Sequence, residues 1–418
     1  MDDPPGMTLA NREFDIVILG AGPVGTTLAL LLAGSPHRVL LVEQRELAAS
    51  EQDPRALALS EGARQLLNPQ GAWPTTTGIG DGRCTPIETI HISQAGGLGR
   101  TLIDRQDYRI PALGYVVRYG ALIACLHQAL RRAIKRVGEQ LVCLEKTAAR
   151  VMDEPSNPAA RDTTDHGFWR SVELTHDGNP TIVRTRLIVH AEGTPPDDSP
   201  GVIARGYGQR AIIFEAGLAQ THGQRAWERF TPQGPLALLP VDGISGKRVS
   251  VVYTVPENNA EQLLALDDAA ILQRIQQAIG PQAQFTDIGP RASFPLNLRL
   301  RQPAIKAREL WIGNAAQTLH PVSGQGFNLG LRDAALLAQA LRQTLDPGSA
   351  PVLHRYARSR QMDRWGAAGF TDGIVRTFST PFPVLNTVRG IALGALDVIA
   401  PLRHFVARRM IWGARAWP

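Results

Sequence analysis

The chain has 418 residues, 44% of them hydrophobic and 20% charged, which is enough for two globular domains and argues against disorder. Three cysteines without a CxxC pair exclude a cysteine zinc site and a disulfide framework, and they are typical of a reducing compartment. The net charge is +6, and residues 351–418 alone hold ten basic and three acidic residues, so the rest of the chain does not indicate nucleic-acid binding.

The first part of the chain predicts a βαβ unit. A strand is expected at 14–20, a helix at 24–33 and a second strand at 38–43. The N-terminus has no basic segment that leads into an apolar one, so we expect neither a secretory signal nor a transmembrane helix. The protein is therefore predicted to be cytoplasmic.

After the first unit, the hydrophobic pattern of the sequence changes from one typical of helices to one typical of strands, and then back again. After Arg55 we expect a helix to Leu67, a strand at 87–93, a helix at 119–137, a surface loop at 153–167, and two strands around Asp177-Gly178 that end at 185–191. Residues 210–295 predict an antiparallel sheet, with strands near 211–217, 235–240 and 248–255 and a helix at 267–279. A short strand at 310–313 and a nearly all-helical segment from 327 follow. The sequence thus predicts an α/β fold in which a second sheet interrupts a parallel one.

A dinucleotide-binding fingerprint follows the first strand. Residues 20–25 read GAGPVG, so Gly20 permits a tight turn, Gly22 lets a pyrophosphate approach the backbone, and Gly25 lets helix and strand pack closely. Glu43 ends the second strand at the spacing expected of a ribose-binding acid. The fingerprint alone does not separate NAD from FAD, and a glycine-rich turn without a ligand is the alternative.

A second cofactor segment is predicted at residues 310–335. A buried strand ends at Gly313, and an irregular loop leads into a helix that starts near Phe327 or Asn328. Gly324 and Gly326 would let backbone N–H groups approach a flat ring. The start of the helix would favour an electron-rich group there.

The order and spacing of these segments resemble the class A flavoprotein monooxygenases, specifically the ubiquinone-biosynthesis hydroxylases. The resemblance covers almost the whole chain, and its marks are GAGPVG with Glu43, DPRALALS, PALGYVVR, ERFTPQGPLALLP, GNAAQ…HPVSGQGFNLGLRDAALLA and FTDGIVRTFS. It implies a Rossmann-like FAD-binding domain of the glutathione-reductase and p-hydroxybenzoate-hydroxylase type, with an inserted antiparallel substrate domain and C-terminal helices. The expected bounds are 12–84, 108–200 and 297–350 for the FAD domain, 85–107 and 201–296 for the substrate domain, and 351–418 for a basic helical segment.

The resemblance also implies the roles of site residues. Arg55 and Arg118 would reach the FAD phosphate or ribityl region, Asn314 the ribityl hydroxyls, and residues 321–328 the isoalloxazine. Both arginines fit a surface position equally well from the sequence alone, and Phe294, Pro295 and Leu296 fit either a plain core or a strand beside the ring. The residues predicted to bind FAD are Gly20, Gly22, Pro23, Val24, Gly25, Glu43, Gln44, Arg45, Arg55, Arg118, Gly193, Gly313, Asn314, Pro321, Gly324, Gln325, Gly326, Phe327 and Asn328, of which Pro321, Gly324, Gln325 and Gly326 would face the flavin.

The chemistry implied by the resemblance belongs to FAD. NAD(P)H would reduce the flavin, O2 would give a C4a-hydroperoxide, and a polyprenylated phenol would be hydroxylated in ubiquinone biosynthesis. The sequence contains no HxxxH, HExxH or GxSxG pattern, so we expect neither a metal nor a protein nucleophile. His320 is a candidate proton donor, and a structural or exposed loop histidine is the alternative.

Three residues depart from the family pattern: Glu192 and Asn314 stand where Asp is usual, and Gln317 where His is usual. They motivate a second hypothesis, a flavin-poor homologue that is a structural member of a ubiquinone-biosynthesis complex. A third hypothesis is a reductase, or a hydroxylase of another substrate, on the same fold.

The C-terminal segment 382–418 mixes apolar residues and two tryptophans with five arginines. A basic amphipathic segment with aromatic residues is suited to an anionic lipid surface, here the inner face of the cytoplasmic membrane. Docking to a protein partner, or a helix packed on the FAD domain with a solvated basic face, would give the same pattern.

Overall fold

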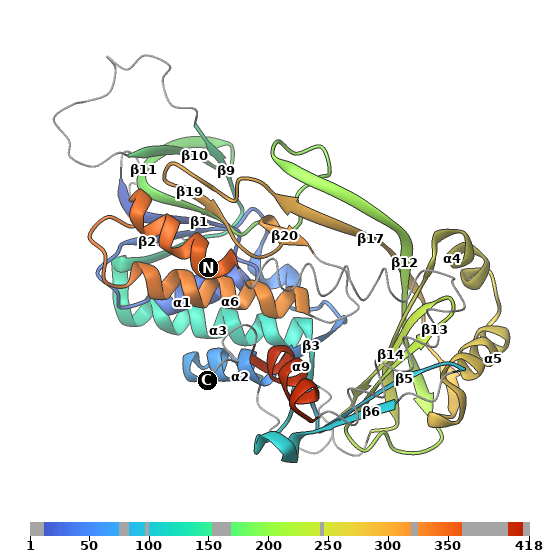
Figure 1. Ribbon diagram of the computed structural model, residues 1–418. Helices are drawn as coiled ribbons and strands as arrows, with labels where there is room; N and C mark the ends of the chain where they lie inside the picture. The colour runs from blue at the N-terminus through green and yellow to red at the C-terminus, as the bar shows by residue number, and fades with distance from the viewer. Residues whose placement is uncertain are drawn as a thin grey trace.

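The structure is a computed structural model that describes residues 12–74, 83–96, 100–152, 169–242, 246–318, 325–361 and 400–412. Within these ranges the chain forms two large sheets and one small sheet. Figure 1 shows the first large sheet and its helices on one side of the molecule and the second large sheet on the other. The predicted loop at 153–167 lies outside the described residues, so its conformation stays a prediction.

The first large sheet contains the predicted βαβ unit and is mainly parallel. β1 (Glu13–Leu19) lies between β2 (Val39–Val42) and β11 (Asn179–His190), parallel to both. The other strands of this sheet are β8 (Leu141–Leu144), β9 (Thr147–Val151), β10 (Arg170–His176), β18 (Ile305–Lys306) and β19 (Glu309–Trp311). β1 is apolar on both faces because one face packs against helices and the other against β9 and β10.

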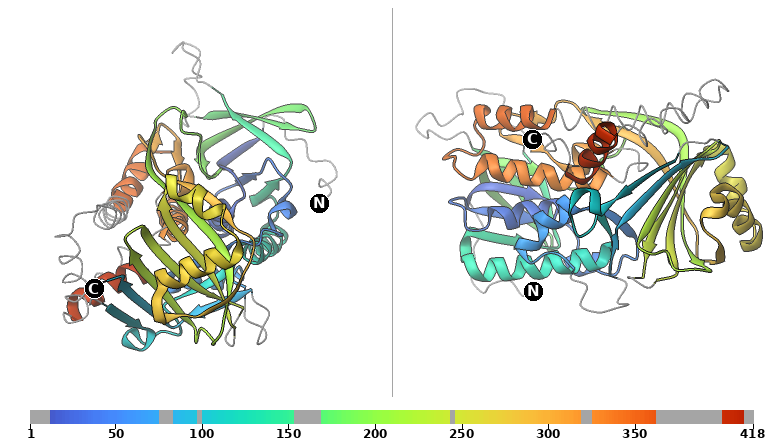
Figure 2. Two further views of the ribbon diagram at one scale, coloured as in Figure 1. Left: turned by 90° about the vertical axis from the view of Figure 1, so that its right-hand side faces the viewer. Right: turned by 60° about the horizontal axis from the view of Figure 1, so that its bottom comes forward.

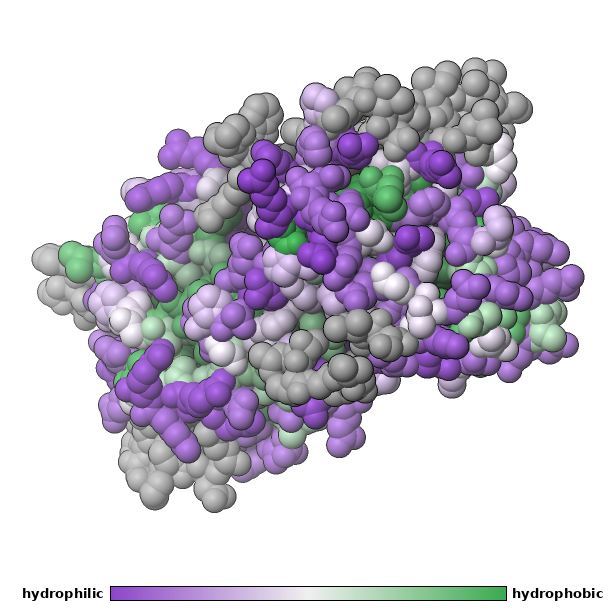
Figure 3. Space-filling view, turned by 90° about the horizontal axis from the view of Figure 1, so that it is seen from below, coloured by the Kyte–Doolittle hydropathy of each residue, from purple (hydrophilic) through white to green (hydrophobic). Residues whose placement is uncertain are grey.

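Three helices cover the inner face of this sheet: α1 (Pro23–Leu32), α3 (Tyr119–Val137) and α6 (Gln325–Leu341). Nine of the ten residues of α1 are buried, because it packs on the sheet with α6 on one side and α3 on the other. α3 is amphipathic, and its basic residues Arg131, Arg132, Lys135 and Arg136 are exposed. The face of the molecule seen from below is mostly hydrophilic, with smaller apolar areas (Figure 3). The helix that returns near residue 327 therefore completes the same core as the first unit.

The second large sheet is the predicted antiparallel insertion. Its strand order is β20-β17-β12-β15-β14-β13-β5-β6, with β16 paired to β12. The strands are β5 (Thr89–Gln94), β6 (Arg100–Asp104), β12 (Val202–Leu218), β13 (Arg225–Thr231), β14 (Gly234–Val241), β15 (Arg248–Pro256), β16 (Phe285–Ile288), β17 (Ala292–Arg301) and β20 (Gln317–Thr318). Helices α4 (Glu257–Leu264) and α5 (Asp268–Ile279) cover the face turned away from the first sheet (Figure 2). The other face is turned toward the first large sheet and its helices.

The segment after Arg55 corrects a sequence expectation. Instead of one helix to Leu67, the chain forms β3 (Ala56–Ser60) and then α2 (Glu61–Leu67). β3 pairs with β7 (Gly114–Arg118), which also pairs with β4 (Cys84–Ile87), so a strand far along the chain overrides the local pattern. Ser60 then caps α2, because its side chain accepts a hydrogen bond from the Ala63 N–H at 3.2 Å.

Other elements were misjudged in smaller ways. The predicted strand at 87–93 is divided: Ile87 ends β4 in the small sheet, while β5 belongs to the second large sheet. The strand at 310–313 ends at Trp311, and Gly313 begins the 3-10 turn Gly313–Ala315. β13 and α4 were not predicted. In the described part of the segment that was expected to be nearly all helical, the helices are α6, residues 350–361 and α9 (Ala400–Trp412). The predicted domain boundaries stay a prediction.

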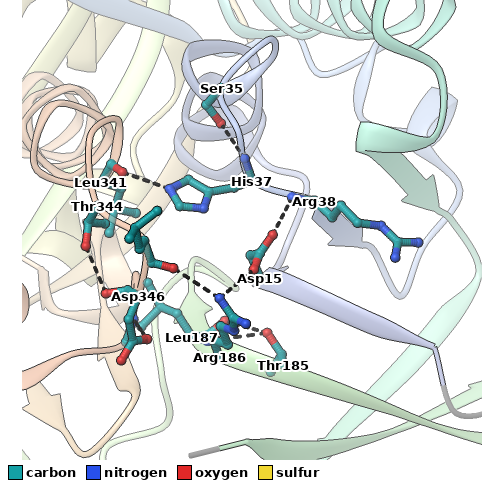
Figure 4. Close-up of polar contacts among 12 residues, drawn as sticks. Asp15, Ser35, His37, Arg38, Thr185, Arg186, Leu187, Leu341, Thr344 and Asp346 are labelled. Atoms are coloured by element: carbon teal, nitrogen blue, oxygen red, sulfur yellow. Dashed lines mark hydrogen bonds and ion pairs between the residues drawn. The ribbon is translucent and has the colours of Figure 1, made fainter. Parts of the chain in front are cut away.

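Polar contacts join the segment at the end of α6 to the start of β1, at the amino ends of the parallel strands (Figure 4). Asp15 accepts a hydrogen bond from the Arg38 backbone N–H at 2.9 Å and lies 3.5 Å from the Arg186 guanidinium. Arg186 also donates a hydrogen bond to the carbonyl of Leu345, a residue that follows α6, at 3.0 Å. These contacts hold the amino ends of β1 and β2, the middle of β11 and the segment at the end of α6 together.

Candidate functional site

One large cavity joins the two cofactor segments to the second sheet. It has a volume of about 1060 Å³ and lies beyond the carboxyl ends of β1 and β2, where Gly20 and Glu43 line it. Gly22 and Gly326, which are 304 positions apart, both line this same cavity. Its far side is formed by residues of β12 to β15 and β17. The cavity is of the size that proteins use for large ligands.

The start of α1 explains the spacing of the three glycines. Gly20 has φ +98°, and a Cβ there would lie 2.6 Å from the Ala191 carbonyl oxygen. A Cβ on Gly25 would lie 1.9 Å from the Gly20 carbonyl oxygen, so strand and helix can meet only if residue 25 is glycine. A Cβ on Gly22 would meet nothing within 4 Å, and no side chain caps the helix. The first N–H groups of α1 are therefore open to the cavity, which fits a bound phosphate.

Glu43 holds the turn at the end of β2. Its Oε2 accepts a hydrogen bond from the Ala21 N–H at 2.8 Å, and its Oε1 accepts one from the Arg45 N–H at 3.0 Å. Each carboxylate oxygen has a second lone pair, so these bonds leave acceptors for ligand hydroxyls. Gln44 and Arg45 also line the cavity, as do Pro23 and Val24.

The start of α6 forms the second cofactor segment. Gly326, Phe327 and Asn328 line the cavity. Asn328 is buried and joins the helix to β3, because it accepts from the Ser60 N–H at 2.9 Å and donates to the Ala58 carbonyl at 3.2 Å. A Cβ on Gly326 would meet nothing within 4 Å, so the backbone is open to a close approach at this point.

The 3-10 turn Gly313–Ala315, which precedes α6, is held by a hydrogen bond to that helix on one side and lines the cavity on the other. The Gly313 N–H donates to Asp333 at 2.9 Å, and Asp333 forms a buried ion pair with Arg360. Asn314 lines the cavity and donates to the Thr194 hydroxyl at 3.3 Å. Gly193, with φ +96°, lines the cavity beside them.

The two predicted phosphate-region arginines lie in different surroundings. Arg55 lines the cavity, pairs with Asp53 at 2.6 Å and lies over the ring of Tyr119. Arg118 is not among the cavity-lining residues. Its guanidinium binds Glu215 and lies 3.4 Å from Asp242, so it joins β7 to the second sheet. The FAD-binding role of either arginine stays a prediction.

Part of the predicted flavin-facing loop lies outside the residues that the structure describes. His320, Pro321 and Gly324 fall in the range 319–324, and for Gln325 only its place at the start of α6 is described. Their predicted roles therefore stay predictions.

The side of the cavity formed by the second sheet is apolar. Phe294 and Leu296 of β17 line it, together with the small side chains of Ala211, Ala226, Ala237 and Ala292. The hydroxyl and carboxyl residues that the described strands of this sheet add to the cavity wall are Thr254, Thr318 and Glu228. Burial raises the pKa of Glu228 to about 8. No role for Glu228 was predicted from the sequence.

A buried histidine beside the fingerprint was also missed. His190 ends β11, stacks on the ring of Trp311, and bonds to Glu192 and Glu309 at 2.8 Å each. Although burial opposes it, hydrogen bonds with the two carboxylates raise the pKa of His190. Glu192, one of the three departures from the family pattern, thus has a partner that a shorter Asp would reach less easily. A carboxylate two positions from a strand-ending histidine is the signal that could have revealed this cluster.

The described residues contain no group of three His, Cys, Asp or Glu side chains arranged to hold a metal ion. None of the helices in the described ranges is long and apolar enough to cross a membrane.

Comparison with known proteins adds the family. Residues 176–371 match the FAD binding domain family. The chain is 31% identical to ubiquinone hydroxylase UbiL of Rhodospirillum rubrum over its full length and 95% of that relative. The chain belongs to the ubiquinone-biosynthesis hydroxylases, which are FAD-dependent aromatic monooxygenases. The hydroxylase is also 27% identical to the 3-demethoxyubiquinol 3-hydroxylase of Escherichia coli, over 95% of this chain and 98% of that one.

A solved structure shows the same fold for the hydroxylase. PqsL, a probable FAD-dependent monooxygenase from Pseudomonas aeruginosa, superposes with a TM-score of 0.69 at 21% identity, covering 91% of this chain and all of the other. FAD is thus the cofactor, and the fold class expected from the sequence is confirmed. The open N–H groups at the start of α1 and the open backbone at Gly326 of α6 fit that cofactor.

Proposed function

We propose that the protein hydroxylates the aromatic ring of a polyprenylated phenol in ubiquinone biosynthesis, with NAD(P)H as the reductant and O2 as the oxidant. The observation that carries this proposal is the single cavity that runs from Gly22 past Gly326 to an apolar sheet. The names of two relatives point to quinone precursors, and an apolar wall suits a substrate with a prenyl chain.

FAD would lie along this cavity, with its pyrophosphate at the first N–H groups of α1 and an adenosine ribose at Glu43. Asn314 would meet the ribityl hydroxyls, and the start of α6 at Gly326 would face the isoalloxazine. The chemistry that FAD supplies when bound is hydride acceptance from NAD(P)H and activation of O2. We also propose that residues 85–107 and 201–296 form the substrate domain, and that 12–84, 108–200 and 297–350 form the FAD domain.

The residues of the chain would contribute binding, orientation and exclusion of water. The positive end of the α6 dipole would stabilise negative charge on the ring held beside it. The wall formed by Phe294, Leu296 and the four alanines would exclude water around the substrate. Neither contribution needs a metal or a protein nucleophile.

The proposal is tested with purified protein. We expect a yellow protein with a flavin absorbance spectrum that oxidises NAD(P)H faster when 2-prenylphenol is added. Mass spectrometry after reaction under ¹⁸O2 should find one labelled oxygen atom in the product. A colourless protein that ignores added FAD would instead support the structural, flavin-poor homologue, and faster NAD(P)H oxidation without a labelled product would support a reductase.

We further propose a peripheral membrane contact through the basic C-terminal segment. In α9, Ala407 and Ile411 pack against Ile103 and Leu113, and Ile411 also lines the cavity. A lipid surface that met this helix would therefore lie near a wall of the cavity. Residues 382–399 and 413–418 lie outside the described residues.

The membrane contact is tested by changing charge rather than by truncation, because α9 covers apolar residues of the fold. The double variant Arg408→Glu/Arg415→Glu should lose co-sedimentation with vesicles that contain anionic phospholipid. Vesicles of neutral lipid are the control. Unchanged co-sedimentation with anionic vesicles would contradict the proposal, and binding to another protein of the pathway that survives without vesicles would favour a complex.

A further inference from the structure

Glu228 is placed differently from the other residues of the cavity wall. It lies in β13, directly across from Ala237 of β14 on one side and Ile92 of β5 on the other. It is partly buried and lines the cavity. Among the described residues that the second sheet adds to the cavity wall, its side chain is the one that can ionise.

The ionisable side chains of the neighbouring strands are turned away from Glu228 or bound to others. Side chains alternate between the faces of a strand. His91 of β5 pairs with Trp227, whose ring belongs to the core under α4 and α5, so His91 lies on the opposite face from Glu228. Arg229 of β13 donates to the Ala278 carbonyl on that face. β14, with the sequence GPLALLPV, contains no ionisable side chain.

The charged groups on the cavity side have partners of their own. Glu215 of β12 binds Arg118. Four ionisable side chains across the cavity also have partners: Glu43 binds backbone N–H groups, Arg55 pairs with Asp53, His127 with Glu51, and Glu192 with His190. Arg45 and Glu46 lie in the turn after β2. Arg45 is 3.9 Å from Glu43, and Glu46 is 3.5 Å from Lys146. The ring of Tyr119 lies under the Arg55 guanidinium. In the described part of the chain, no hydrogen bond or ion pair joins the side chain of Glu228 to another residue.

A carboxyl in such a place is unfavourable for folding and suited to a ligand. Burial among apolar groups raises its pKa to about 8, so at neutral pH it is mostly protonated and can exchange a proton close to the working pH. The small side chains around it leave space for a flat ring. Local rules of folding are most often broken at positions that serve function.

We propose that Glu228 is a catalytic residue that contacts the phenol hydroxyl of the substrate and, as the carboxylate, accepts its proton. The inference rests on the proposed function. The phenol O–H bond breaks, a carboxyl O–H bond forms, and the electron pair stays on the phenolate oxygen, where it raises the electron density of the ring. No electrons leave or enter the substrate in this step. The proton returns to the product oxygen before release.

The first test measures phenol binding without turnover. Oxidised, FAD-loaded protein is titrated calorimetrically with 2-prenylphenol between pH 6 and 9, without NAD(P)H. We expect the affinity of the wild type to rise as pH passes about 8, because the carboxylate is the better hydrogen-bond acceptor. Glu228→Gln, which has the same shape, should bind with no such rise. Glu261→Gln is the matched control, since Glu261 lies exposed on α4 beyond the other face of the sheet.

The second test measures hydroxylated product. Glu228→Gln should lose about 100-fold or more in product formation, while its flavin absorbance shows that it still binds FAD. Glu228→Asp keeps the carboxyl and should restore a pH dependence with a lower rate. It also replaces Glu228→Gln as the test if that variant does not fold.

The two proposals fail in different ways. The proposal for Glu228 is overturned if Glu228→Gln binds the phenol with the wild-type pH dependence and makes product within about threefold of the wild-type rate. If the wild type binds the phenol with the expected pH dependence and Glu228→Gln does not, but the wild type makes no hydroxylated product, the proposed function fails and the contact with Glu228 stands. A wild type that binds no phenol overturns both.

Discussion

At the scale of single residues, Glu228 links stability to pH in a direction opposite to that of most carboxyls. Its folded-state pKa is raised from 4.5 to about 8, so the folded protein resists the loss of its proton. Below pH 4.5 the carboxyl is neutral in both states and the raised pKa has no effect. Between pH 4.5 and 8 the unfolded chain loses the proton first, so the free energy of unfolding falls as pH rises.

Glu228→Gln should therefore be more stable than the wild type at high pH, and not at low pH. We expect a gain on the order of 1–3 kcal/mol at pH 8.5, allowing for screening by cavity water, and almost none at pH 4.5. Urea unfolding at both pH values measures it, with Glu261→Gln as the control. A gain of equal size at both pH values would show that the carboxyl is not buried as the structure has it.

At the scale of elements, the start of α1 shows how two neighbouring glycines differ in purpose. Gly25 is needed by the protein itself, because a Cβ there would lie 1.9 Å from the Gly20 carbonyl oxygen. Gly22 has open space on its cavity side and an extended ψ of 179°, so alanine fits the fold at that position. The same kind of substitution should thus separate stability from cofactor binding.

We expect Gly25→Ala to destabilise the FAD-free protein by about 1–3 kcal/mol or more. Gly22→Ala should change that stability by less than about 1 kcal/mol, yet weaken FAD binding by about tenfold or more, since its methyl group would occupy the place of a phosphate. Chemical unfolding of the FAD-free protein and flavin fluorescence titration measure the two effects. Equal FAD affinity for Gly22→Ala and the wild type would place the pyrophosphate elsewhere.

At the scale of the whole molecule, the sequence predicts those parts whose local signals agree with their tertiary setting. Strand, glycine turn and helix agree around Gly20 and Gly25, and the amphipathic period of α3 agrees with its place on the core. β3 was predicted as helix because its pairing partner, β7, lies some 60 residues further along the chain. The direction of the Glu228 side chain depends on the strand register of the second sheet, which no local pattern around β13 records.

Arg118 is the residue for which sequence and structure suggest different roles, and its test concerns how the two halves of the molecule are joined. The family resemblance assigns Arg118 to FAD, whereas in the structure its guanidinium binds Glu215 of β12, and both side chains are partly buried. If Arg118 ties the sheets together, Arg118→Gln and Glu215→Gln should destabilise the protein similarly, with a coupling energy of about 1 kcal/mol in a double-mutant cycle. Neither variant should then change FAD affinity by more than about threefold.

If Arg118 binds FAD instead, only the Arg118 variant should weaken FAD binding. The coupling energy between Arg118 and Glu215 should then vanish in the FAD-loaded protein, because one guanidinium cannot bind both the carboxylate and the phosphate.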